Sequence, residues 1–89
     1  MNSNINFNIE IIIDEYSNYV FKIVDNIIGT SLPYEDKEEV VSDVFYLLWK
    51  NQDKITKNFK GYLGVIAKNC SYSKLRKSND NLEYQDNLL

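Results

Sequence analysis

The spacing of the apolar residues constrains the fold most, because they recur every three or four positions in three blocks of the chain. This period places apolar side chains on one face of an α-helix, whereas alternation at every second residue predicts a strand. The first block carries them at Ile9, Ile12, Ile13, Tyr16, Val20, Ile23, Val24 and Ile27. It predicts an amphipathic helix of about twenty residues that ends at Gly29, with Pro33 closing the connection that follows.

A second helix is expected to begin near Asp36, because Asp36 and Glu39 have the spacing of a capping box. Its apolar residues wrap more than half of the circumference: Val40, Val41, Val44, Phe45, Leu47, Leu48 and Trp49. Such a helix is packed on two sides, or packed on one side and offered to a partner on another. In both cases Phe45 and Trp49 are expected in the core. A narrow polar stripe remains at Glu39, Ser42, Asp43 and Tyr46.

The third block follows the polar stretch NQDKITKN, which predicts a loop. Its apolar face is expected at Phe59, Tyr62, Leu63, Ile66, Ala67 and Cys70, with Lys60, Gly64, Lys68 and Ser71 on the opposite face. The polar, acidic residues 79–89 predict a linker or disordered tail. The expected fold is therefore all-α, a compact three-helix bundle over residues 1–78, or four helices if a short extra turn forms.

Charge is divided along the chain. Residues 1–49 hold two Lys against nine acidic residues, whereas residues 50–77 hold eight Lys or Arg against Asp53 alone. An acidic first half and a basic second half suggest two different partners, and nucleic acid is the usual partner of a basic segment. A solvated basic helix face explains the second half equally well, so both interpretations stay open at this point.

Several classes of protein are disfavoured by what the sequence lacks. The chain has no histidine and a single cysteine, Cys70, which excludes an internal disulfide, the usual zinc sites and His-based catalysis. No glycine-rich phosphate loop is present, so we expect neither an enzyme nor a cofactor. The longest apolar run, Val44 to Trp49, is too short to span a bilayer, and the first ten residues lack a secretory signal. A cytoplasmic protein without a membrane partner is expected.

Two segments resemble region 2 of bacterial RNA polymerase sigma factors of the sigma-70 family, specifically the extracytoplasmic-function type. The segment EVVSDVFYLLWK keeps the family's order of an acidic residue, an aliphatic pair, a polar-acidic pair, an aliphatic residue, Phe and a final Leu-Trp. The segment FKGYLGVIAKNCSYSKLRK follows the family's next helix, with Tyr62 at its Trp position and Lys68 at its Arg position. The loop between the segments also has the family's length.

The resemblance implies a transcription initiation factor that binds core RNA polymerase and opens the promoter minus-ten element. It places four residues against the clamp helices of the largest polymerase subunit: Glu39, Ser42, Asp43 and Tyr46. It assigns contacts with the non-template single strand of promoter DNA to Lys54, Lys57, Lys60, Tyr62, Lys68, Asn69, Lys74, Arg76 and Lys77. Tyr62 is the expected stacking residue, and the loop 51–58 is expected to cradle a flipped base.

This sequence also departs from the family. Ser42 stands where the family usually has Gln, which removes a long hydrogen-bonding side chain from the expected polymerase contact. The family continues into a DNA-binding region 4, whereas this chain stops at Leu89, so an excised domain is favoured over a reduced protein. An anti-sigma factor is a further candidate partner by resemblance. The alternative function is a helical interaction module, a regulator or a self-associating bundle, without DNA-melting activity.

Overall fold

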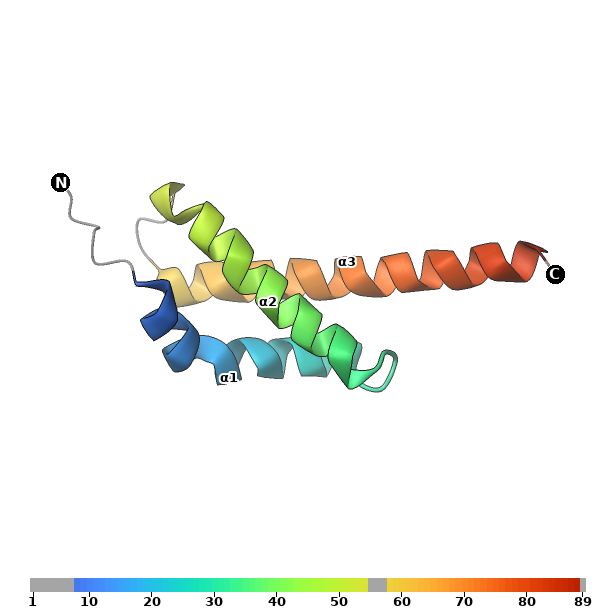
Figure 1. Ribbon diagram of the computed structural model, residues 1–89, viewed down its shortest axis with the longest axis horizontal. Coiled ribbons are helices and arrows are strands. Elements are labelled where there is room, and N and C mark those ends of the chain that lie inside the picture. The colour runs from blue at the N-terminus through green and yellow to red at the C-terminus, as the bar shows by residue number, and fades with distance from the viewer. Residues whose placement is uncertain (1–7, 55–57, 89) are drawn as a thin grey trace.

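The computed structural model describes the backbone of residues 8–54 and 58–88 and the side chains up to residue 79. Three α-helices and one short 3-10 helix follow one another along the chain, and this part of the chain contains no strand (Figure 1). They are α1 (Ile9–Ile28), α2 (Tyr34–Lys50), the 3-10 helix η2 (Gln52–Lys54) and α3 (Phe59–Leu88). The predicted all-α, three-helix architecture is therefore confirmed.

Helix α1 is capped at both ends, by Asn8 and by Gly29. The Asn8 side-chain oxygen accepts hydrogen bonds from the backbone N–H groups of Glu10, at 3.0 Å, and Ile11, at 3.3 Å. At the other end Gly29 has φ of 54°, a left-handed conformation that favours glycine, and its N–H donates to the Asp25 carbonyl at 2.7 Å. The predicted length of α1 and its end at Gly29 are both confirmed, whereas the Asn8 cap was not anticipated.

Helix α2 begins at Tyr34, earlier than predicted, and the proposed capping box is wrong. Pro33 occupies the N-cap position with φ of −64°, and no side chain caps this helix. Asp36 already lies in the first helical turn, where its own N–H donates to the Pro33 carbonyl at 3.0 Å. Glu39 instead reaches across to Lys74 on α3. Because proline fixes its φ at a value compatible with helix entry, the helix starts before Asp36 can act as a cap.

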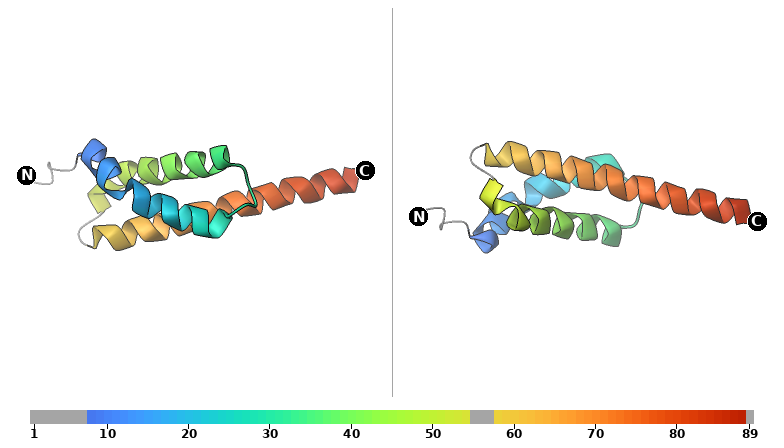
Figure 2. Two further views of the ribbon diagram at one scale, coloured as in Figure 1. Left: turned by 90° about the horizontal axis from the view of Figure 1, so that it is seen from below. Right: turned by 90° about the horizontal axis from the view of Figure 1, so that it is seen from above.

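The core lies where all three helices meet, and each helix packs against the other two (Figure 2). It consists of Val20, Val24, Ile28, Val40, Val44, Phe45, Leu48, Leu63 and Ala67. Phe45 is buried as predicted, but Trp49 is 50% exposed, so its assignment to the core is wrong. Four residues after Phe45, Trp49 lies about 40° further round α2. This rotation moves its ring to the edge of the contact with α1.

The inner face of α3 is wider than the apolar pattern predicted, because it packs against both α1 and α2. Gly64 and Ser71, expected on the exposed side, are both buried. At Gly64 a Cβ atom would lie 2.8 Å from the Tyr19 hydroxyl, so glycine leaves room for the end of the Tyr19 side chain against α3. The Tyr19 hydroxyl donates to the Lys60 carbonyl at 3.2 Å. Ser71 satisfies its hydroxyl by donating to the Ala67 carbonyl at 2.8 Å.

Helix α3 continues to Leu88 and projects beyond the other two helices (Figure 1). The sequence predicted that it would end near residue 78. No glycine or proline follows Gly64, so no residue interrupts the backbone hydrogen bonds. The helical backbone of residues 79–88 differs from the predicted disordered tail, while a linker role stays a prediction. Within the described ranges, no helix is both long and apolar enough to cross a membrane.

Candidate nucleic-acid and protein interface

The four residues predicted to bind polymerase all lie exposed on one side of α2, which we call the α2 ridge: Glu39, Ser42, Asp43 and Tyr46. Grooves run along both sides of this ridge. One lies between α2 and α3, and the other lies between α1 and α2. Tyr46 lines both grooves. The ridge therefore offers two adjoining surfaces with different chemistry.

The α2–α3 groove has a mixed charge. The Lys74 ammonium nitrogen lies 2.7 Å from a carboxylate oxygen of Glu39, so a residue predicted to bind DNA is paired with one predicted to bind polymerase. Lys77 and Asp43 also line this groove. Lys74 is therefore less available to an external phosphate than the sequence suggested.

The ion pair shifts the titration of both partners. The hydrogen bond from Lys74 lowers the pKa of Glu39, and the charge of Lys77 adds to this effect. The same hydrogen bond raises the pKa of Lys74. Burial, followed by the negative charge of Asp43, raises the pKa of the Cys70 thiol. Cys70 is half-buried in the groove and stays a protonated thiol at neutral pH, in line with its predicted place on the apolar face of α3.

Helix α3 also carries a second surface, which we call the α3 outer face and which adjoins this groove at Asn69. It consists of Val65, Lys68, Asn69, Tyr72 and Arg76, which are all exposed. A rotation of 100° per residue places these five side chains within about 100° of arc, facing away from the buried Leu63 and Ala67. Neither Lys68 nor Arg76 forms an ion pair with a side chain that the structure describes.

The remaining residues predicted to bind DNA are not gathered into one patch. Lys54 is exposed on η2, and Lys57 lies outside the described residues. Lys60 is exposed at the start of α3, with its ammonium nitrogen 4.8 Å from the centre of the Tyr19 ring. Tyr62 is half-buried and packs against the core. The predicted stacking residue therefore offers less of its ring than an exposed tyrosine would.

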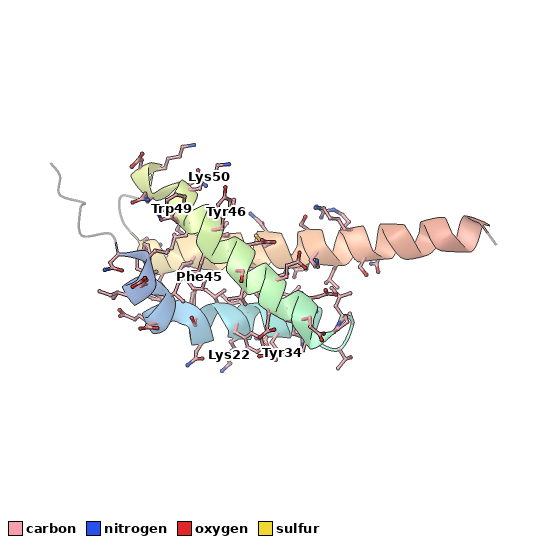
Figure 3. All side chains as sticks on the ribbon, viewed as in Figure 1. Lys22, Tyr34, Phe45, Tyr46, Trp49 and Lys50 are labelled. Atoms are coloured by element: carbon pink, nitrogen blue, oxygen red, sulfur yellow. The ribbon has the colours of Figure 1, made fainter. Side chains whose placement is uncertain are left out.

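The α1–α2 groove is mainly apolar. It is lined by Ile9, Ile13, Val41, Ser42, Phe45, Tyr46 and Trp49. Figure 3 shows Tyr46, Trp49 and Lys50 together on the last turns of α2, and the Tyr46 and Trp49 ring centres are 6.4 Å apart. The sequence did contain a signal for this surface, because the apolar residues of α2 wrap too much of the helix to be buried by one neighbour.

Tyr72 and Val65 are the exposed residues of the α3 outer face that the sequence analysis did not single out. The available signal was their position, since both lie on the same side of the helix as Lys68 and Arg76. No group of side chains suited to a metal ion occurs in the part of the chain that the structure describes. Comparison with protein-family models, curated proteins and solved structures found no match for this chain.

Proposed function

We propose that this chain is a transcription initiation factor domain of the sigma region 2 type. In this proposal the α2 ridge binds the clamp helices of core RNA polymerase. The α3 outer face binds the non-template strand of the minus-ten element as it is opened. The sequence resemblance supports both assignments, and the arrangement of charges on the two surfaces is consistent with them.

The observation that carries the proposal is the separation of the two surfaces. The α3 outer face is directed away from the buried side of α3, against which α1 and α2 pack, whereas the α2 ridge lies beside the grooves. Of the five outer-face residues, Asn69 alone also lines the α2–α3 groove. A nucleic acid on α3 would therefore leave the α2 ridge accessible to a protein. An initiation factor needs this property, because it must hold the polymerase and the opened promoter at the same time.

Asp43 is the carboxylate of the α2 ridge best placed to meet a basic partner. It is exposed and forms no ion pair among the described side chains, whereas Glu39 is already paired with Lys74. A carboxylate that meets Arg or Lys across an interface contributes orientation as well as attraction. We therefore assign Asp43 the leading polar role in polymerase binding.

The polymerase contact is tested by charge reversal at Asp43. Binding of the Asp43→Arg variant to purified bacterial core RNA polymerase is measured by fluorescence anisotropy, with Asp14→Arg on the exposed side of α1 as the matched control. We expect at least tenfold weaker binding for Asp43→Arg, since a like charge now faces a basic partner. Equal binding by both variants, or none by the wild type, would contradict the polymerase assignment.

The DNA contact is tested by a second charge reversal. Lys68→Glu is compared with Lys22→Glu, an exposed lysine of α1, for binding to a labelled single-stranded oligonucleotide over a range of salt concentrations. Each phosphate contact contributes about 0.7 to the salt slope for single strands. We expect Lys68→Glu to weaken binding and flatten this slope, and Lys22→Glu to change neither by a comparable amount. A larger loss of binding in Lys22→Glu than in Lys68→Glu would exclude the α3 outer face as the DNA-binding surface.

A second candidate function is a self-associating helical module, which the α1–α2 groove favours. Trp49 and Tyr46 expose about half of their surface there, beside Ile9 and Ile13. Exposed apolar grooves commonly mark protein contacts. Sedimentation analysis of the wild type against Trp49→Ser tests this function, with Tyr34→Ser as the control for an exposed aromatic residue elsewhere on α2. A concentration-dependent dimer that only Trp49→Ser dissociates would favour it.

A further inference from the structure

We infer that Tyr72 forms a base-stacking site on the α3 outer face, with Lys68 and Arg76 holding the phosphates on either side. Its ligand is single-stranded nucleic acid. This inference rests on the proposed function, and it moves the stacking role from Tyr62, which the sequence favoured, to a residue that sequence analysis did not single out.

The availability of the two rings decides between Tyr62 and Tyr72. Tyr72 is 55% exposed, and its ring contacts no other aromatic ring among the described residues. Tyr62 is half-buried against the core, so a base could reach only part of its ring. Stacking requires an open ring face, because the two flat surfaces must exclude water from each other. Tyr72 meets this condition without a change in the fold.

Two cations flank Tyr72 at equal distances along the helix. Lys68 lies four residues before Tyr72 and Arg76 lies four residues after it, which places each about 6 Å away along the helix axis. Both are exposed and unpaired among the described side chains. Lys74 is nearer in sequence but is paired with Glu39, so it is a weaker candidate for a phosphate contact.

Val65 extends the site by a second apolar contact. It is 56% exposed and lies seven residues before Tyr72, two turns away on the same face of α3. An aliphatic side chain can support a neighbouring base by packing against it. No acidic residue occurs between Phe59 and Asn79, whereas three acidic residues follow from Asp80 onward. The charge pattern therefore limits the anionic ligand to the first two thirds of α3.

The chemistry favours a single strand over a duplex. In a duplex the base faces are stacked on one another and cannot meet an aromatic side chain unless they are first unstacked, which costs free energy. A site that combines one open ring with flanking cations should therefore bind a single strand more tightly than a duplex. Duplex DNA of the same sequence would meet the cations alone, so a comparison of the two ligands separates stacking from simple charge attraction.

A fluorescent residue placed at the site gives the most direct test. Trp49 is the only tryptophan of the chain, so the double variant Tyr72→Trp/Trp49→Phe has a single reporter on α3. Titration with a short oligodeoxythymidylate is expected to quench its emission, because a stacked base lies against the indole. The matched control is Tyr34→Trp/Trp49→Phe, whose reporter lies at the exposed start of α2 and is expected to stay unquenched. Equal quenching in both variants would overturn the inference.

Affinity measurements complete the test. We expect Tyr72→Ala to bind the single strand about tenfold more weakly, within the range measured for base–aromatic stacking, and Tyr72→Phe to bind like the wild type. Circular dichroism and thermal unfolding check that each variant is folded. If Tyr72→Ala binds normally while Lys68→Glu binds weakly, the stacking inference is wrong, but the assignment of the α3 outer face as the DNA-binding surface is retained. If the wild type binds no single strand, or binds the duplex equally well, the inference is overturned as well.

Discussion

On the two faces of α3, the burial of a side chain does not follow its polarity. Ser71, a polar residue, is fully buried, whereas its neighbour Tyr72 is 55% exposed. Ser71 is tolerated inside because its hydroxyl donates to the Ala67 carbonyl. Tyr72 stays outside because no other helix covers that side of α3. Position around the helix, rather than hydrophobicity, decides which side chains are available to a partner.

The same comparison applies to the lysines of α3. Lys68 is exposed on the outer face, and Lys74 lies in the α2–α3 groove with its charge paired to Glu39. Their local sequences give no reason to treat them differently. The structure separates a cation that is available to a ligand from one that is already engaged within the fold.

Truncation of one apolar residue on each face should show the largest difference. We expect Leu63→Ala to lower the free energy of unfolding by about 2–5 kcal/mol, because it leaves a cavity in a fully buried position. Val65→Ala on the outer face should change stability little, since more than half of the side chain is already in water. Urea unfolding measures both values. Similar losses of unfolding free energy in the two variants would show that the α3 outer face is buried.

Removal of one lysine from each face should have a smaller effect, on ligand binding rather than on stability. We expect Lys68→Ala to weaken binding of a single-stranded oligonucleotide several-fold and to lower its salt slope by about 0.7, as for one lost phosphate contact. Lys74→Ala should weaken it less, because Lys74 is engaged with Glu39. A greater loss in Lys74→Ala would place the nucleic acid over the α2–α3 groove instead.

The pH-dependent contribution of the Glu39–Lys74 pair to stability should be a smaller effect still. The pKa of Glu39 is lowered from 4.5, so its contribution to stability is present above the usual Glu range and is lost as pH falls through the lowered pKa. The pKa of Lys74 is raised, so its contribution disappears only as pH rises through that higher value. The stability difference between wild type and Glu39→Gln, measured by thermal unfolding, should therefore shrink on acidification. A constant difference would show that the negative charge of Glu39 contributes nothing to stability. The effect is small because Glu39 is exposed.

The smallest expected effect is on the rate at which the Cys70 thiol is alkylated. Since burial and Asp43 raise its pKa, iodoacetamide should modify it more slowly than a free thiol at neutral pH. Asp43→Asn removes one of the two causes and should speed the modification modestly, as followed by mass spectrometry. Rapid alkylation of the folded wild type would show that the α2–α3 groove is more open than the structure indicates.

Much of the fold was predictable because the helices are encoded locally. The apolar spacing identified three helices, Gly29 marked the end of the first, and Phe45 was assigned correctly to the core. The start of α2 was less predictable, because Asp36 matched a capping pattern that Pro33 made unnecessary. The end of α3 was also missed, since a polar composition lowers helix propensity without breaking a helix.

The candidate surfaces were predictable only in part. The sequence correctly located an exposed polar stripe on α2 and exposed cations on α3, because both follow from helical spacing. It could not tell that Lys74 would meet Glu39, because these residues are 35 positions apart. It also placed Trp49 in the core, since a helical pattern shows which residues share a face but not how far a neighbouring helix extends over that face.

The sequence by itself determined that three helices form, which apolar residues lie on the inner face of each, apart from Trp49, and the division into acidic and basic halves, because each depends on residues close together in the chain. Only the tertiary structure decided how far the buried side of α3 extends, which lysine is paired and which tyrosine is open to a ligand. The physical reason is that burial and ion pairing depend on the angle at which separate helices meet. That angle is set by packing across the whole core.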